Sequence, residues 1–163
     1  MEEKASNGRT TIERRSEREL VVTRTFDAPA RRVFDAWTRS ELFKQWWAPK
    51  SSPVPLLSCE MDARTGGGYR LAFGRDAANS MAFFGKYLDV SPPARLVWTN
   101  EESADAAVTT VTFEEDDGRT RLVLQERYPT TEARDEACAG MAGAMPEQFE
   151  QLDELLVALG AKA

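Results

Sequence analysis

The 163-residue sequence predicts an α+β fold in which a curved, seven-stranded antiparallel sheet wraps around a long C-terminal helix. Three observations lead to this prediction. One β-rich segment precedes two short amphipathic helices, six strand-like segments follow in succession, and a long apolar stripe of helical period ends the chain. Short turns between six strands favour a meander, and the simplest closure places the first strand beside the last.

The first elements follow a polar and charged segment. Residues 1–17 contain one isolated apolar side chain, Ile12, and are interpreted as a flexible leader, so the domain is expected over residues 18–163. The segment ELVVTRTF predicts a strand at about 18–26. In DAPARRVFDAW, apolar side chains fall on one helical stripe, which predicts the first short helix.

The segment SELFKQWW, residues 40–47, predicts a second short helix that ends before Pro49, because proline disfavours helical geometry at the preceding residue. Its adjacent tryptophans, Trp46 and Trp47, would point about 100° apart on a helix. We therefore expect Trp46 to anchor the core and Trp47 to line or cover the mouth of a cavity. The alternative is that both are plain core packing.

The next six segments have the composition of strands and are separated by turn residues. The stretch RTGGG lacks the sequence and the following helix of a phosphate-binding loop, so it predicts a hairpin turn, in which Asp62 and Arg64 pair or cap. In DDGR, Gly118 is suited to a positive φ. The predicted strands are 56–63, 69–74, 80–90, 95–100, 106–115 and 120–128.

The last segment, about residues 131–160, predicts the long helix. Pro146 lies inside it and predicts either a kink or a fresh helix start at Met145. We expect the apolar stripe to lie against the concave face of the sheet and to leave space between the two layers. The stripe consists of Met141, Met145, Phe149, Leu152, Leu156 and Leu159.

Composition excludes several classes of function. With 21 Lys and Arg residues against 27 Asp and Glu, the net charge is −6, which argues against binding to nucleic acid or to an anionic membrane. The chain contains no histidine, which removes the usual general base and the commonest metal ligand. We therefore expect no metal, no cofactor and no assigned catalytic residue, and a cytoplasmic location in the absence of a signal or membrane span.

Four segments together resemble a known family. They are RTFDAPARRVFDAWTRSELFKQWWAP, DARTGGGYR, GKYLDVSPPARLVWT and VTFEEDDGRTRLVLQE, in this order within residues 18–160. They are similar to the activator of heat-shock protein 90 ATPase homologue-like domain of the START-like (SRPBCC, Bet v 1-like) superfamily. The resemblance implies a helix-grip fold with a hydrophobic cavity between sheet and long helix, often holding a small apolar ligand. The superfamily includes carriers, receptors, cyclases and co-chaperone domains, so the fold alone does not define the activity.

Alternation along the strands identifies the candidate cavity residues. On residues 69–74, Tyr69, Leu71 and Phe73 share one face, and a tyrosine hydroxyl there would orient a ligand. Methionines on the helix are either core filler or adaptable contacts to a ligand. The candidate ligand-binding residues are Trp46, Trp47, Tyr69, Phe73, Phe83, Tyr87, Trp98, Met141, Met145 and Phe149.

Three functions remain open at this point. The first is a binding protein for a small hydrophobic molecule, and the second is a protein-interaction module of co-chaperone type that binds a chaperone or another protein. The third is a cyclase- or dehydratase-like enzyme that uses tyrosine and carboxylate groups. Its candidate acid–base residues, which are more commonly exposed strand charges, are Glu60, Asp62, Arg70, Glu126 and Arg127. The sequence is compatible with a monomer or a homodimer.

Overall fold

The computed structural model describes residues 3–7, 10–14, 16–48, 56–74, 76, 78, 80–101 and 107–161. In this part of the chain, nine strands form one sheet in the order β1-β2-β3-β9-β8-β7-β6-β5-β4, and neighbouring strands are antiparallel. The elements are β1 (Glu3–Asn7), β2 (Thr10–Arg14), β3 (Glu19–Phe26), α1 (Ala30–Thr38), α2 (Ser40–Phe43), β4 (Leu56–Met61), β5 (Gly68–Gly74), β6 (Ser80–Ser91), β7 (Arg95–Asn100), β8 (Ala107–Asp116), β9 (Arg119–Arg127) and α3 (Thr131–Ala161).

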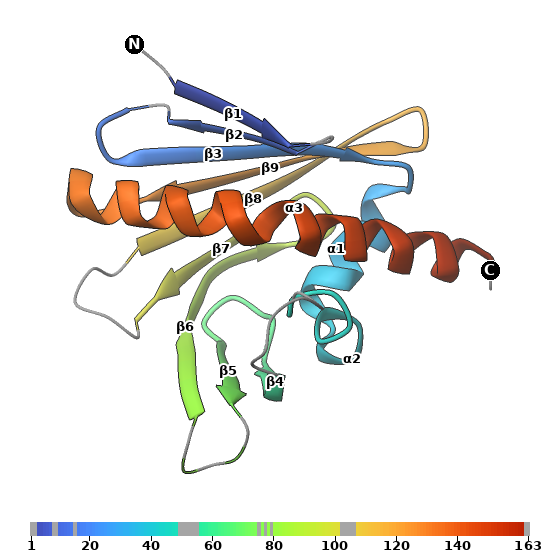
Figure 1. Ribbon diagram of the computed structural model, residues 1–163. Coiled ribbons are helices and arrows are strands. Elements are labelled where there is room, and N and C mark those ends of the chain that lie inside the picture. Colours follow the sequence, from blue (N-terminus) through green and yellow to red (C-terminus); the bar gives the residue numbers. More distant parts are fainter. Residues whose placement is uncertain are drawn as a thin grey trace.

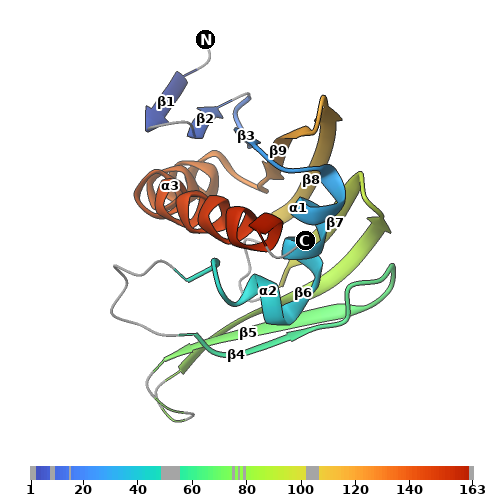
Figure 2. The ribbon, with the colours of Figure 1, turned by 90° about the vertical axis from the view of Figure 1, so that its right-hand side faces the viewer.

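The sheet curves around α3, so the predicted α+β class and wrapped architecture are confirmed. Figure 1 shows α3 crossing the sheet, and Figure 2 shows the strands from β1 to β4 curving around it. Helices α1 and α2 lie beside the C-terminal part of α3 (Figure 1). Among the described residues, none of the helices is both long enough and apolar enough to cross a membrane.

Two strands lie within residues 1–17, where the sequence indicated a flexible leader. β1 pairs with β2, and β2 pairs with β3, which raises the strand number from the predicted seven to nine. On β2, Thr10 is 1% exposed and Ile12 is 4% exposed, and Ile12 belongs to the main core. Among the side chains of this segment that the structure describes, Ile12 is the one apolar residue in the core, and a single position is too little for a period to be recognised in the sequence.

The closure predicted for the sheet is confirmed. β3 pairs with β9 from Glu19 opposite Arg127 to Phe26 opposite Thr120, although about a hundred residues separate these strands in the chain. Arg24, on β3, is fully buried and forms ion pairs with Glu150 at 3.2 Å and Asp153 at 3.6 Å on α3. A buried charge needs such partners, so these contacts fix the rotation of α3 over the sheet.

The helices differ in detail from the sequence prediction. α2 ends at Phe43, and residues 44–46 form a turn. In this turn the backbone N–H of Trp46 donates to the backbone carbonyl of Phe43 at 3.2 Å. The expected helix over 40–47 is therefore only one turn long. α3 is one helix of 31 residues that continues through Pro146, so no fresh start forms at Met145.

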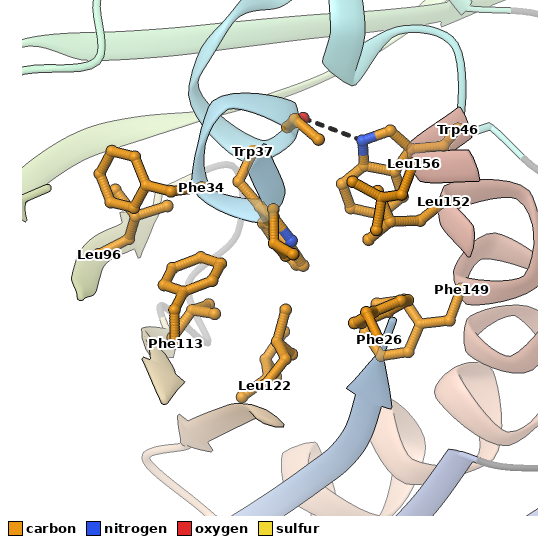
Figure 3. Packing of buried hydrophobic residues seen from close by; sticks show 14 of the residues in the cluster. Phe26, Phe34, Trp37, Trp46, Leu96, Phe113, Leu122, Phe149, Leu152 and Leu156 are labelled. Carbon is orange, nitrogen blue, oxygen red and sulfur yellow. Dashed lines mark hydrogen bonds between the residues drawn. The ribbon is translucent and has the colours of Figure 1, made fainter. Parts of the chain in front are cut away.

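A cluster of aromatic rings forms the centre of the core (Figure 3). Trp37, on α1, contacts Trp46 edge-on with ring centroids 4.8 Å apart, and contacts Phe149 at 6.3 Å. Phe149 in turn lies edge-on to Phe26 at 5.6 Å. Aromatic pairs in this geometry stabilise beyond the area they bury. The cluster therefore joins α1, the turn after α2, β3 and α3 in one packed unit.

The predicted turns are confirmed. Between β8 and β9, Asp117 has φ 55° and Gly118 has φ 77°, the positive values that a tight hairpin with right-handed strand twist requires. Between β4 and β5, RTGGG forms the expected turn, and Arg64 pairs with Asp62 with an Nε–Oδ2 distance of 2.9 Å. Both segments are therefore hairpin turns that join neighbouring antiparallel strands.

Candidate functional site

A cavity of about 310 Å³ lies between the sheet and the helices. Eight of the residues that line it are aromatic. The sheet contributes Met61 from β4, Tyr69, Leu71 and Phe73 from β5, Phe83 and Tyr87 from β6, Trp98 and Asn100 from β7, Thr109 from β8, and Leu124 and Glu126 from β9. The helical side contributes Trp37, Phe43, Trp47, Met145 and Gln148.

The alternation of strands β5 and β6 places their rings in the cavity. Tyr69, Leu71 and Phe73 all line it, as period 2 predicts. On β6, Phe83 lines the cavity, whereas its neighbour Phe84 is 42% exposed on the other face. Phe73 and Phe83 meet edge-on at 5.6 Å. The β5–β6 pair therefore forms an aromatic wall.

The two adjacent tryptophans have different surroundings. Trp46 has no exposed surface, and its Nε1–H donates to the Ala36 carbonyl at 2.9 Å (Figure 3). Trp47 is half-buried, lines the cavity and stacks on Phe43 with centroids 4.8 Å apart. This arrangement agrees with the expected division into an anchor and a cavity contact. The expected rim loop, residues 49–55, lies outside the described residues.

Seven of the ten candidate ligand-binding residues line the cavity, and their contact with a ligand stays a prediction. They are Trp47, Tyr69, Phe73, Phe83, Tyr87, Trp98 and Met145. Trp46 and Phe149 are fully buried and do not line it, because the first is turned to α1 and the second to β3. The side chain of Met141 lies outside the described residues.

A row of hydrogen-bonded polar residues, which the sequence did not predict, crosses one wall of the cavity. The Tyr69 hydroxyl donates to the Thr99 carbonyl at 2.7 Å and lies 3.2 Å from Asn100 Oδ1. Asn100 Nδ2 donates to Thr109 Oγ1 at 3.0 Å, and Thr109 Oγ1 donates to Glu126 Oε2 at 2.8 Å. Tyr69, Asn100, Thr109 and Glu126 therefore act as one hydrogen-bonded unit that spans four strands.

Gly85 permits the approach on which this row depends. A Cβ at this position would lie 1.8 Å from the Thr99 carbonyl oxygen, which no side chain tolerates. The absence of a side chain lets β7 lie close against β6, where the same carbonyl accepts the hydrogen bond from Tyr69.

Two glutamines of α3 hold the turn that follows α2. Gln151 Nε2 donates to the carbonyls of Trp46 at 3.1 Å and Ala48 at 3.0 Å, and Gln148 Nε2 donates to the carbonyl of Trp47. Gln148 is 8% exposed and Gln151 is 7% exposed. Both are buried although the sequence pattern placed them off the apolar stripe. We call Gln148 and Gln151 the amide clamp. It positions the indole of Trp47 at the cavity.

Burial governs the titration of groups around the cavity. Burial raises the pKa of the Cys59 thiol to about 11, and nearby Lys44 opposes this shift. Burial also raises the pKa of Tyr87 well above its ordinary value, helped by the negative charges that Cys59 and Asp62 carry when ionised. For Tyr128, burial and then the charge and hydrogen bond of Glu126 raise the pKa strongly. These hydroxyls and this thiol stay neutral at physiological pH.

The five candidate acid–base residues differ in their exposure to solvent. Glu126 lines the cavity, whereas Glu60, Asp62, Arg70 and Arg127 are exposed. Their strand alternation or turn position directs them to solvent. Within the described residues, no three His, Cys, Asp or Glu side chains are placed to hold a metal ion.

The class of protein follows from this geometry. One long helix held in the concave face of a curved antiparallel sheet, with an apolar cavity between them, defines the START-like helix-grip (SRPBCC, Bet v 1-like) class. Residues 27–157 match the family model described as "Activator of Hsp90 ATPase homolog 1-like protein", and the chain belongs to this family. No curated protein matches the chain at a significant level.

Solved structures share the fold over most of the chain. A crystal structure from Rhodobacter sphaeroides has 24% identity and a TM-score of 0.79, covering 98% of this chain and 99% of that one. A crystal structure from Nitrosomonas europaea has 24% identity and a TM-score of 0.78, covering 90% and 98%. A solution structure from Staphylococcus epidermidis has 27% identity and a TM-score of 0.74, covering 89% and 93%. At identities below 25%, the first two likenesses show the fold alone.

Proposed function

We propose that this protein binds a small hydrophobic molecule in the cavity between the sheet and α3. The observation that carries the proposal is the aromatic cavity of about 310 Å³. Its volume falls at the lower end of the roughly 300–1,000 Å³ that is typical of small-molecule sites.

The lining supports binding rather than loose packing. Rings from β5, β6 and β7 face rings from α1 and the segment after α2, and a few polar groups converge from one wall. Small-molecule sites have this composition, with apolar surface for affinity and few polar groups for orientation.

Two neighbouring phenylalanines give a matched test. Phe83 lines the cavity and Phe84 faces outward on the same strand, so each can be replaced by alanine without changing the other face. In a fluorescence titration with the neutral probe Nile red, Phe83→Ala should weaken binding about tenfold, whereas Phe84→Ala should leave it unchanged. Native mass spectrometry of the purified protein should also detect a co-purified small molecule. Absence of probe binding to the wild-type protein would refute the proposal.

One observation favours a protein-interaction role as the second candidate. Leu57 on β4 and Phe84 and Leu88 on β6 are 42%, 42% and 50% exposed, and Phe84 lies on the face away from the cavity. Exposed apolar side chains on neighbouring parts of a sheet are typical of interaction surfaces. If this role is correct, Phe84→Ala should weaken capture of a partner protein while Phe83→Ala should not, which is the reverse of the result expected for the cavity.

A further inference from the structure

We propose that the ligand is a neutral molecule with an apolar body and a carbonyl oxygen, such as a ketone, and that the Tyr87 hydroxyl donates a hydrogen bond to this oxygen. This inference rests on the proposed function, because it names the chemistry of the molecule that the cavity would hold. The hydrogen bonding of the wall, its charge and the position of Trp98 each support it.

The two tyrosines of the cavity wall differ in how their hydroxyls are held. The Tyr69 hydroxyl donates to the Thr99 carbonyl at 2.7 Å, so its hydrogen is already used. Tyr87 is 4% exposed, with its ring centroid 5.8 Å from that of Tyr69, and its hydroxyl makes no hydrogen bond to any residue that the structure describes. Buried tyrosine hydroxyls ordinarily have a partner. Tyr87 therefore offers the hydroxyl of this wall that is open to a ligand.

A second buried donor indicates that the group to be supplied is an acceptor. A tyrosine hydroxyl can donate or accept, but an indole N–H can only donate. Trp37 lines the cavity and is 1% exposed, and its Nε1 has no hydrogen-bond partner among the described residues. The Nε1 of Trp46, by contrast, donates to the Ala36 carbonyl (Figure 3). The lining thus leaves donors unsatisfied, which favours a ligand that carries an acceptor.

The charge of the lining favours a neutral acceptor. Among the described residues that line the cavity, none is Lys or Arg. A carboxylate moved from water into this lining would find no cationic side chain to replace its hydration, and an isolated buried charge is costly. Burial raises the pKa of Tyr87 well above its ordinary value, so the hydroxyl keeps the hydrogen that it donates. A carbonyl oxygen accepts this bond without carrying a charge.

Trp98 is adjacent to both donors and provides a surface for the apolar body. It lies opposite Tyr87 in the pairing of β6 with β7, and its ring centroid is 5.9 Å from that of Trp37. Trp98 also lines the cavity, and an aromatic body can stack on its indole or meet it edge-on. We expect the carbonyl group of such a body to be directed towards β6, where Tyr87 lies.

Three probes of similar shape test the proposal. 2-Acetylnaphthalene has the carbonyl, 2-isopropenylnaphthalene replaces its oxygen by a methylene group, and 2-naphthoate is an anion at pH 7. Displacement of Nile red measures their dissociation constants. Tyr87→Phe, which removes only the hydroxyl, should weaken binding of the ketone about fivefold to tenfold and leave binding of the alkene unchanged. The wild-type protein should bind the anion more weakly than the ketone.

A matched variant and a spectroscopic measurement separate the hydrogen bond from a change in the fold. Tyr128→Phe removes the hydroxyl of another buried tyrosine, which is not among the residues that line the cavity, and should keep the ratio of the ketone and alkene dissociation constants. If Tyr87→Phe does not fold, infrared spectroscopy of the ketone bound to the wild-type protein is the test. Its carbonyl stretch should lie below the frequency in hexane, and an unshifted band would overturn the proposal.

Other outcomes also overturn the proposal. These are equal weakening of the ketone and the alkene by Tyr87→Phe, no weakening of either, and tighter binding of naphthoate than of the ketone. Each refutes this inference alone, because the cavity still binds apolar molecules. Failure of all three probes and of Nile red to bind the wild-type protein would instead refute the proposed function.

Discussion

Single residues around Trp46 and Trp47 determine both stability and the shape of the cavity. Trp46 fills the core and donates its indole hydrogen to Ala36, whereas Trp47 reaches the cavity over Phe43. The sequence places these rings side by side, and the turn after α2 sends them to different surroundings.

Trp46→Ala should lower the free energy of unfolding by roughly 3–5 kcal/mol, because it removes a fully buried ring and leaves the Ala36 carbonyl without its donor. Trp47→Ala should cost about 1 kcal/mol of stability but weaken Nile red binding about tenfold, which corresponds to about 1.4 kcal/mol. Urea denaturation and fluorescence titration measure the two effects. Equal destabilisation by both substitutions, with binding unchanged, would show that the pair is plain core packing.

The thiol of Cys59 gives a prediction for pH dependence. Burial raises its pKa from 9.0 to about 11, so the protonated form is favoured in the folded protein. The stabilisation that this contributes is present below about pH 9 and is lost as the pH rises through 11. The sequence has one other cysteine, Cys138, and a Cys138→Ala variant leaves Cys59 as the single thiol. In this variant, the rate of alkylation by iodoacetamide should rise with a midpoint near pH 11 in the folded protein. The same variant unfolded in urea is the control, and a folded midpoint at its value would contradict the prediction.

At this scale, the sequence predicts apolar contacts better than polar ones. The spacing of Tyr69 and Phe73 assigns both to one face, since alternation is a property of the strand itself. The row from Asn100 through Thr109 to Glu126 depends on which strands pair and in what register. These residues have the composition of an exposed strand face, and only the pairing of β7, β8 and β9 brings their side chains together.

Among the elements, α3 couples the core to the cavity. Its stripe places Phe149 against Phe26 and Trp46, and Met145 reaches the cavity from the same face. The ion pairs of Arg24 fix the helix from the side of β3. α3 therefore has a fixed rotation, and the same face of the helix both packs in the core and lines the cavity.

Phe149→Ala should lower the free energy of unfolding by roughly 3–5 kcal/mol, because the ring is fully buried among other rings. Val157→Ala is the control on the same helix, since Val157 is 66% exposed and its loss should change stability by less than about 0.5 kcal/mol. Chemical denaturation monitored by circular dichroism measures both. A cost well below about 1 kcal/mol for Phe149→Ala would show that α3 is not held at this point.

The stripe on α3 was predictable because helical period is local. The amide clamp was not, because Gln148 and Gln151 have polar side chains beside the stripe and gain partners only when the turn after α2 is placed against them. The continuous path through Pro146 also depends on tertiary packing, which outweighs the local preference of proline to begin or bend a helix.

At the scale of the whole molecule, the N-terminal strands cover an edge of the sheet. β2 pairs along β3, which would otherwise be an edge strand and open to association with other chains. Ile12 contributes to the same core as residues of β9 and α3. The segment interpreted from sequence as a leader therefore takes part in the fold.

Ile12→Ala should lower the free energy of unfolding by about 2–4 kcal/mol, because Ile12 is 4% exposed within the core. For a chain of this size that is a decrease of several degrees in the melting temperature. Thr11→Ala, one residue away on the other face of β2, should have little effect. If neither substitution changes the melting temperature, residues 1–17 are dispensable as their composition indicated.

The global topology was largely predictable from the sequence. Two helices between the first and second predicted strands leave the first strand free to pair elsewhere, and a curved meander brings its last strand to that position. The β3–β9 pair follows from this arrangement. Strands β1 and β2 were not predictable, because their five-residue segments are polar and charged and show no alternation of apolar residues in the sequence.

The amide clamp binds the turn through hydrogen bonds to backbone carbonyl oxygens, which every amino acid carries whatever its side chain. Gln148 and Gln151 thus fix where the turn runs without regard to which side chains it presents. Trp47 is free to be exchanged for another residue over generations while its backbone stays in position. Under the proposed binding function, a substitution of Trp47 would therefore change what the cavity recognises while the scaffold stays the same.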